Sequence, residues 1–287
     1  MFESAHSRLL KAIELGDNEK VHSLLTSDIV NDADKQGMTA LLSAAGRGQL
    51  STVRLLLDTG AKVNLSAADG ETAIMAAARH GAAPVMEALI AAGADVNAAD
   101  QIGATPLILA TVWATRMASV GIADTVSKVK LLLDAGANVK TADGRGRSAI
   151  MTQVRSGGGT FQEKNRLPVL KALIEAGGEV DAAGNRGRTP LMAAAFRGLR
   201  ETFHVLLDAG ANPYLRDHNS RNALMHAAEG AFWTYRKAGY IDIFNTLIDM
   251  DIDLMEKNSS GMTALAIARR NKCKDLVNLL VKAGAYD

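Results

Sequence analysis

The sequence predicts an all-α solenoid built from short repeats, and the first observation behind this is the spacing of its glycines. Six glycines each follow a run rich in leucine and isoleucine, at intervals of 33, 43, 41, 33 and 74 residues: Gly60, Gly93, Gly136, Gly177, Gly210 and Gly284. The last interval divides into 41 and 33 if Asp251 stands in for a missing glycine. A base period of 33 indicates a repeat protein, which grows by adding units and not by enlarging one core.

The second observation is a helix start at the same place in every repeat. Seven residues in phase with the period have side chains that can accept a hydrogen bond from a free backbone N–H at a helix N-terminus: Thr39, Thr72, Thr105, Ser148, Thr189, Asn222 and Thr263. Proline follows at Pro106 and Pro190, and proline suits the first helical position. Small residues and then a second Val/Leu run follow, so each repeat predicts a pair of short helices.

The blocks GMTALLSAA (37–45), GATPLILA (103–110) and GRTPLMAAA (187–195) resemble ankyrin repeats, and the resemblance covers nearly the whole chain. It implies an all-α solenoid with β-hairpin fingers between the helix pairs. We expect a single domain over residues 1–287, in which a capping helix pair at 3–33 is followed by seven repeats at 34–66, 67–99, 100–142, 143–183, 184–216, 217–257 and 258–287. Methionine often replaces the family's usual histidine, as at Met192, which favours a bacterial member.

The composition argues against catalysis and against several classes of partner. The formal net charge of +1 gives no global field for nucleic acid or for a membrane. The six histidines are spread over different repeats without metal-ligand spacing. His226 and the nearby Glu229 are interpreted as structural residues and not as an acid/base pair. We therefore expect no enzyme activity, no cofactor and no metal.

Arginine recurs at one repeat position, and this pattern predicts a binding surface. Arg147, Arg188 and Arg221 occupy the position just after the finger in three consecutive repeats, and Arg145 and Arg186 lie at finger tips. Because equivalent positions of stacked repeats lie about 10 Å apart, we expect a basic patch on the concave face of repeats 3–6. It suits a partner protein with an acidic surface patch. The alternative is local pairing of these arginines with Asp143, Asp181 or Asp217.

Repeats 3, 4 and 6 are lengthened between their two helices, within about residues 111–127, 155–166 and 229–240. The resemblance implies that these insertions lie on the side away from the fingers. They carry a concentration of aromatic residues: Trp113, Phe161, Phe232, Trp233, Tyr235 and Tyr240. These side chains either pack on neighbouring helices or form a second surface for a partner, because Trp and Tyr are common in binding hot spots.

The expected function is protein binding without catalysis. The simplest mechanism is steric occlusion or sequestration of a partner, as by an inhibitor or an immunity protein that protects a bacterium from its own hydrolase. The alternatives are a scaffold that joins two partners, and a small-molecule binder that uses a groove lined by the insertions. We expect a soluble protein, monomeric when free, located in the cytoplasm, or in the bacterial periplasm if Met1 replaces a removed signal peptide.

Overall fold

The chain forms two compact units, Met1–Gly144 and Arg145–Asp287, called unit 1 and unit 2 below. The computed structural model describes residues 4–113, 122–155, 163–232 and 237–286. The described residues are helical or lie in turns, with two isolated antiparallel bridges, Ala33 with Thr39 and Ser66 with Thr72.

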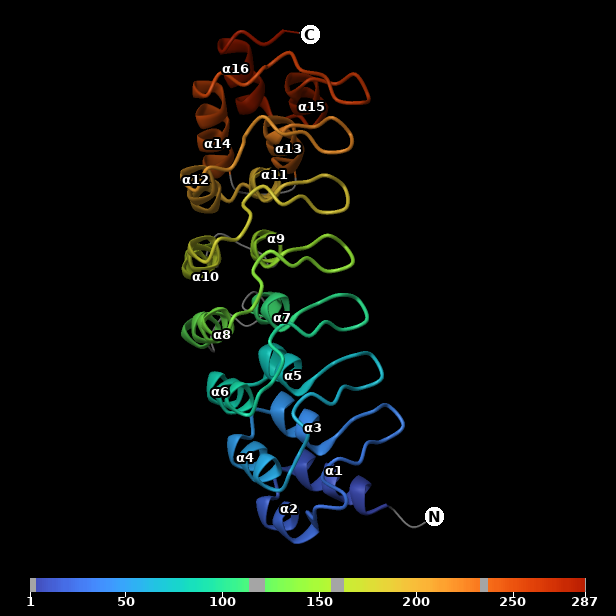
Figure 1. Cartoon of the computed structure of the whole chain (residues 1–287). Helices are drawn as coiled ribbons and strands as arrows, with labels where there is room; N and C mark the ends of the chain where they lie inside the picture. Colours follow the sequence, from blue (N-terminus) through green and yellow to red (C-terminus); the bar gives the residue numbers. More distant parts are fainter. Residues whose placement is uncertain (1–3, 114–121, 156–162, 233–236, 287) are drawn as a thin grey trace. The chain divides into compact units, whose positions relative to one another are not determined.

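Both units consist of consecutive helix pairs. Unit 1 contains α1 (Ala5–Leu15), α2 (Asn18–Leu24), α3 (Ala40–Gly46), α4 (Leu50–Asp58), α5 (Ala73–His80), α6 (Ala83–Ala91), α7 (Pro106–Trp113) and α8 (Ile122–Asp134). Unit 2 contains α9 (Ala149–Arg155), α10 (Glu163–Glu175), α11 (Pro190–Arg197), α12 (Arg200–Asp208), α13 (Ala223–Gly230), α14 (Lys237–Asp249), α15 (Ala264–Arg270) and α16 (Lys274–Lys282). Within each unit the first helices of the pairs form one row and the second helices another, and extended turns project from the first row (Figure 1). Each unit is thus a stretch of all-α repeat solenoid.

The predicted caps explain where the first helices begin. Thr39 accepts from the backbone N–H of Leu42 at 3.2 Å, and Asn222 accepts from that of Met225 at 3.0 Å. Thr105, Ser148, Thr189 and Thr263 make the equivalent bond. Thr72 precedes α5 in the same extended conformation but makes no such bond, and its buried hydroxyl has no hydrogen-bond partner in the structure. Six of the seven predicted caps are therefore confirmed, and the prediction for Thr72 is wrong.

The period glycines end the second helices in the left-handed region, as Gly60 does with φ of 98°. Asp251 takes the same place after α14 with φ of 55°. A non-glycine residue is uncommon there, although aspartate tolerates this region better than most side chains. The structure therefore supports the use of Asp251 as the marker of a repeat end.

Three second helices are longer than the others. The helices α8, α10 and α14 have 13 residues each, whereas α4, α6, α12 and α16 have nine. Part of each insertion therefore extends a helix. Two acidic side chains in these extensions reach a neighbouring second helix: Asp124 accepts from the backbone N–H of Ala83 at 2.9 Å, and Glu163 from that of Thr202 at 2.8 Å. Both satisfy donors that a helix N-terminus leaves free.

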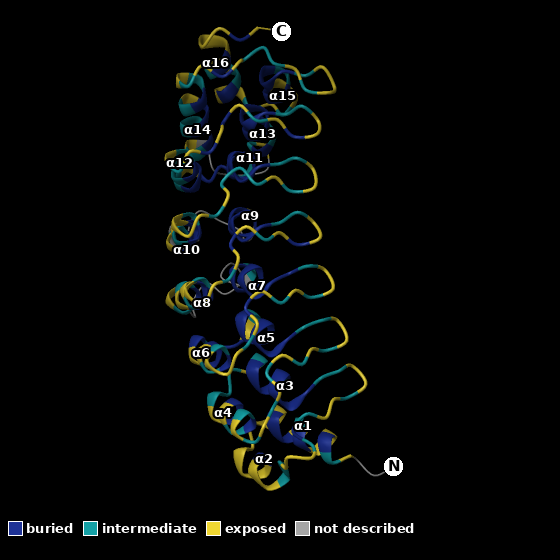
Figure 2. Ribbon diagram, viewed as in Figure 1, coloured by how far each residue is buried: buried dark blue, intermediate teal, exposed yellow. Residues whose placement is uncertain are grey.

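The core of each unit lies between the two rows of helices. The first helices α3, α5, α7, α9, α11 and α13 are mostly buried in the residues that the structure describes, whereas exposed residues gather on the projecting turns and the second helices (Figure 2). The terminal first helices α1 and α15 also carry exposed residues. Alanines at one repeat position, among them Ala44, Ala77, Ala194 and Ala227, are 0% exposed and allow the first helices to pack closely. Among the residues that the structure describes, no helix is long and apolar enough to cross a membrane.

Candidate protein-binding surface

The predicted arginines lie in the projecting turns, which we call fingers. In the finger at residues 217–221, Asp217 Oδ1 accepts from the backbone N–H groups of Asn219 (2.9 Å) and Arg221 (3.0 Å). Ser220 closes the turn with φ of 56°, at the position that glycine occupies in the other fingers. The aspartate at the start of the finger therefore orients the backbone of the residue at its end.

Backbone hydrogen bonds tie the fingers of unit 2 together. The N–H groups of Asn185, His218 and Ser259 donate to the carbonyls of Arg145 (3.4 Å), Arg186 (3.1 Å) and Asn219 (2.9 Å), each in the preceding finger. The spacing of the finger tips is therefore set by the backbone. The side chains of Arg145 and Arg186 are exposed at these tips, and Arg147 is half-buried at the end of its finger.

The last residue of a finger contacts the residue eight positions later, in the last turn of the first helix. The pairs are Glu71 with Arg79 (3.5 Å), Arg188 with Phe196 (5.0 Å from guanidinium carbon to ring centroid), Arg221 with Glu229 (2.7 Å) and Met262 with Arg270 (3.4 Å). The repeat phase contains this eight-residue spacing, but the predicted site residues did not include Phe196, Glu229 or Arg270. We call the surface made by the fingers and these paired residues the finger-side face.

Arg221 is fully paired within the protein. Its Nε and Nη2 donate to Asp217 Oδ2 at 3.0 and 2.8 Å, and its Nη1 donates to Glu229 Oε2 at 2.7 Å. Two carboxylates therefore compensate one guanidinium. For this residue the structure supports the alternative of local pairing with Asp217, and Arg221 is not an available anchor for a partner.

A buried histidine completes this network. His226, 0% exposed, makes a hydrogen bond of 3.0 Å through Nε2 to Asp217 Oδ2. Burial lowers the pKa of His226, and the positive charges of Arg188 and Arg221 lower it further, against the raising effect of Asp217. Burial by itself would raise the pKa of Asp217, but the bonds from His226, Arg221 and Asn219 hold it well below its usual range. We infer a neutral His226 that donates to an ionised Asp217, a structural role for both.

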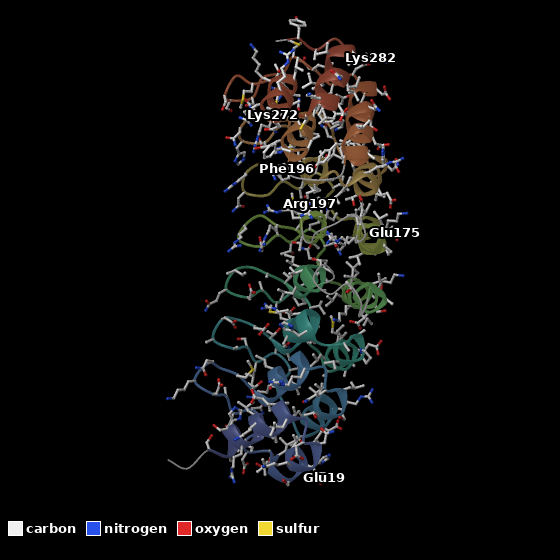
Figure 3. The ribbon with its side chains drawn as sticks, turned by 180° about the vertical axis from the view of Figure 1, so that it is seen from behind. Glu19, Glu175, Phe196, Arg197, Lys272 and Lys282 are labelled. Atoms are coloured by element: carbon white, nitrogen blue, oxygen red, sulfur yellow. The ribbon has the colours of Figure 1, made fainter. Side chains whose placement is uncertain are left out.

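Arg188 contacts an aromatic ring where Arg221 contacts a carboxylate. Its guanidinium stacks on Phe196, which lies with Arg197 in the last turn of α11 (Figure 3). Burial lowers the pKa of Arg188, and the positive charges of Arg221 and Arg155 lower it as well, against the raising effect of the Glu229 and Asp217 carboxylates. Within the described ranges no carboxylate lies within ion-pair distance of Arg188. A half-buried cation of this kind is partly desolvated without a direct ion-pair partner.

The insertion aromatics do not form one described surface. Tyr240 is 1% exposed, its hydroxyl donates to the carbonyl of Phe196 at 2.8 Å, and its ring packs on Gly198, where a Cβ would come within 2.9 Å of it. Because of this packing, Tyr240 is not available to a partner. Phe232 is 55% exposed. Phe161, Trp233, Tyr235 and the side chain of Trp113 lie outside the described residues.

The two units carry opposite net charges. Unit 1 has 12 Lys and Arg against 16 Asp and Glu, a formal charge of −4, whereas unit 2 has 20 against 15, a charge of +5. The near-neutral total of +1 conceals this asymmetry.

Among the residues that the structure describes, no group of three His, Cys, Asp or Glu side chains is placed to hold a metal ion.

Comparison with known proteins identifies the repeats. A search of curated proteins found no match. The family model "Ankyrin repeats (3 copies)" matches residues 9–100, 60–127, 116–217 and 160–255. Ankyrin repeats form protein–protein interaction modules, and matches over most of its length show that this chain belongs to the ankyrin-repeat family.

Proposed function

We propose that the finger-side face of unit 2 binds an acidic segment of a partner protein, with Arg188 as its central charged anchor. The proposal rests on the environment of the Arg188 guanidinium. It is half-buried on Phe196, and no carboxylate among the described residues lies within ion-pair distance. A carboxylate supplied by a partner would compensate a charge that is already partly desolvated, and arginine can bind it in a bidentate manner.

The surroundings of Arg188 favour the same sign of ligand. Burial is the largest effect that lowers the pKa of Arg188, and Arg221 and Arg155 add to it, whereas Glu229 and Asp217 act in the opposite direction. The net lowering favours a further anion at this place. Arg145 and Arg186 are exposed on fingers of the same unit. The net charge of unit 2, 20 basic against 15 acidic residues, also attracts an acidic surface and raises its rate of association.

The mechanism that we propose is steric. A module that binds a protein without acting on it chemically works by covering or sequestering the bound surface. An inhibitor or immunity protein for a bacterial hydrolase acts in this way, with acidic residues near the hydrolase active site held by the arginines. In the free state we propose a monomer, because two copies of a positive face repel each other.

An adaptor that joins two partners is the second candidate. The opposite charges of the units, −4 from 12 basic and 16 acidic residues and +5 from 20 and 15, favour it. Each unit would then select a partner of the opposite sign. Two partners captured together, of which only one depends on Arg188, would distinguish the adaptor from a single-partner inhibitor.

Affinity capture from the source organism, followed by mass spectrometry, tests the proposal with three baits. They are the wild type, Arg188→Glu and Lys171→Glu, where Lys171 is an exposed lysine on the second helix α10 and gives the same change of charge. We expect one protein to be held by the wild type and by Lys171→Glu, and to be lost with Arg188→Glu. A protein held equally by all three baits would contradict the proposed site.

A further inference from the structure

A polar pocket of about 240 Å³ lies between the last two fingers of unit 2, beside the arginine network. Its lining includes Arg221 and Glu229 from one repeat, and Ser259, Ser260 and Arg270 from the next. The pocket opens on the finger-side face, since its walls are two fingers and the two eight-residue pairs that follow them.

Of the two arginines that line this pocket, Arg270 is available to pair with a ligand, whereas Arg221 is not. Arg221 donates to Glu229 at 2.7 Å and to Asp217 at 2.8 Å, so this arginine and Glu229 compensate each other. Arg270 is exposed, and its recorded polar contact is Nη1 to Met262 Sδ at 3.4 Å. In the described part of the chain no carboxylate lies within ion-pair distance of Arg270. The pocket therefore offers one uncompensated cation and no available anion.

The walls of the pocket are held in place by the protein itself. Asn258 Oδ1 accepts from the backbone N–H groups of Ser260 (2.9 Å) and Met262 (3.0 Å), which shapes the last finger. The N–H of Ser259 donates to the carbonyl of Asn219 at 2.9 Å, which joins the two fingers. A site whose walls are already ordered loses little entropy when a ligand enters.

We propose that this pocket receives one aspartate or glutamate side chain of the partner, whose carboxylate pairs with Arg270 and accepts hydrogen bonds from the hydroxyls of Ser259 and Ser260. A basic side chain is disfavoured, because Glu229, the one carboxylate among the described lining residues, is already bound by Arg221. The inference rests on the proposed function, in that the carboxylate belongs to the same acidic segment. The pocket adds Arg270 as a second anchor, two repeats beyond Arg188. It selects partner segments that carry an acidic residue at the matching position.

Titration of the full chain with two small probes tests the pocket without knowledge of the partner. The probes are N-acetyl-glutamate methylamide, which carries the carboxylate, and N-acetyl-glutamine methylamide, its neutral isostere. The readouts are NMR signals of the arginine Nε–H groups and of the Ser259 and Ser260 amides. The proteins are the wild type, Arg270→Gln and the control Arg269→Gln, which changes the adjacent exposed arginine outside the pocket lining.

We expect saturable shifts at Arg270, Ser259 and Ser260 with the glutamate probe alone. In Arg270→Gln the dissociation constant should rise by about tenfold or more, since a charge-assisted pair is lost, whereas Arg269→Gln should bind as the wild type does. Equal shifts with the glutamine probe, or unchanged binding in Arg270→Gln, would overturn the pocket.

This result is separable from that of the proposed function. Binding of the glutamate probe at Arg270, together with a partner that ignores Arg188→Glu, would support the pocket and refute the proposed central anchor. Loss of the partner with Arg188→Glu, together with no response at Arg270, would support the proposed function and refute the pocket.

Discussion

One charge pair on the finger-side face has opposite polarity in the two units. In unit 1, Glu71 ends a finger and pairs with Arg79 eight residues later at 3.5 Å. In unit 2, Arg221 holds the position of Glu71 and Glu229 that of Arg79, with 2.7 Å between the charged atoms. The fold thus accepts either polarity at this register. The sign of the charge at each of these two positions can therefore differ between the units without a change of fold.

The finger-side arginines of unit 2 differ in whether a carboxylate of the protein pairs with them. Arg221 has two carboxylates, whereas Arg188 has an aromatic ring and Arg270 a thioether sulphur at the corresponding contact. Pairing within the protein makes Arg221 part of the scaffold. The charges of Arg188 and Arg270, which form no ion pair among the described residues, are those that a partner can compensate.

The largest effect on stability is expected from Asp217→Ala in unit 2. It removes a buried carboxylate that binds Arg221 and His226 as well as two backbone N–H groups. Leaving a buried charge network without its partner costs about 3 kcal/mol. The counterpart in unit 1, Asp34→Ala, removes only the two bonds to the backbone of Gln36 and Met38 and should cost about 1–2 kcal/mol. Urea unfolding measures both, and equal losses would contradict a scaffold role that is special to the Asp217 network.

Acidification should weaken unit 2 through His226. Burial holds the pKa of His226 below its ordinary value of about 6.5. The unfolded chain therefore takes up the proton first. This contribution to stability is full above about pH 6.5 and is lost as the pH falls toward the folded pKa.

In His226→Leu the free energy of unfolding should depend less on pH between about pH 7 and pH 5 than it does in the wild type. Leucine fits this place, because Leu109 occupies the equivalent position of unit 1 and is 7% exposed. Urea unfolding at several pH values gives the two slopes. An unchanged slope would show that another group titrates in this range.

A smaller, stabilising effect is expected at Gln153 in α9. The equivalent positions in unit 1 hold Ala44, Ala77 and Ala110, but Gln153 is 2% exposed and neither atom of its side-chain amide has a hydrogen-bond partner in the structure. Replacing a buried unsatisfied amide by an apolar side chain of similar shape removes a desolvation cost. Gln153→Met should therefore raise the free energy of unfolding by about 1 kcal/mol. A loss of stability would show that the amide is satisfied in solution.

The smallest effect is expected when the charge pair of unit 1 is inverted. The double variant Glu71→Arg/Arg79→Glu should stay within about 1 kcal/mol of the wild type, since the pair is partly exposed and opposite charges remain. Burial raises the pKa of Glu71, and Asp69 and Asp100 raise it further, against the effect of Arg79. The burial disfavours either charge, whereas the two aspartates favour an arginine at this position. Glu71→Arg alone should be less stable than the double variant, because it brings two guanidinium groups together. A double variant that is the less stable of the two would refute the tolerance of either polarity.

Much of the fold could be predicted because it depends on local rules. The period and the helix starts follow from cap residues and from glycine conformations, and even Asp251, with φ of 55°, takes the place of a glycine. The exception, Thr72, has the right residue type but makes no cap bond. Capping depends on a side-chain rotamer, which the residue type favours but does not determine.

The candidate site was predictable in position but not in detail. The repeat phase puts Arg188 and Arg221 at one place in consecutive fingers, yet their roles differ because of the residues eight positions later, Phe196 and Glu229. Such contacts depend on how each finger folds back on its helix. The burial of Tyr240 also depends on tertiary packing, here against Gly198. The residue pattern and the composition of the chain do not reveal this packing.

The most direct test of the central claim compares two finger-side arginines, one from each unit. Arg79 of unit 1 is paired with Glu71, whereas Arg188 of unit 2 has no carboxylate among the described residues at ion-pair distance. Calorimetry would give the affinity of the captured partner for the wild type, Arg188→Gln and Arg79→Gln. We predict that Arg188→Gln raises the dissociation constant by about tenfold or more, and that Arg79→Gln changes it by less than about twofold. An unchanged affinity for Arg188→Gln, or a larger loss with Arg79→Gln, would contradict the assignment of partner binding to unit 2.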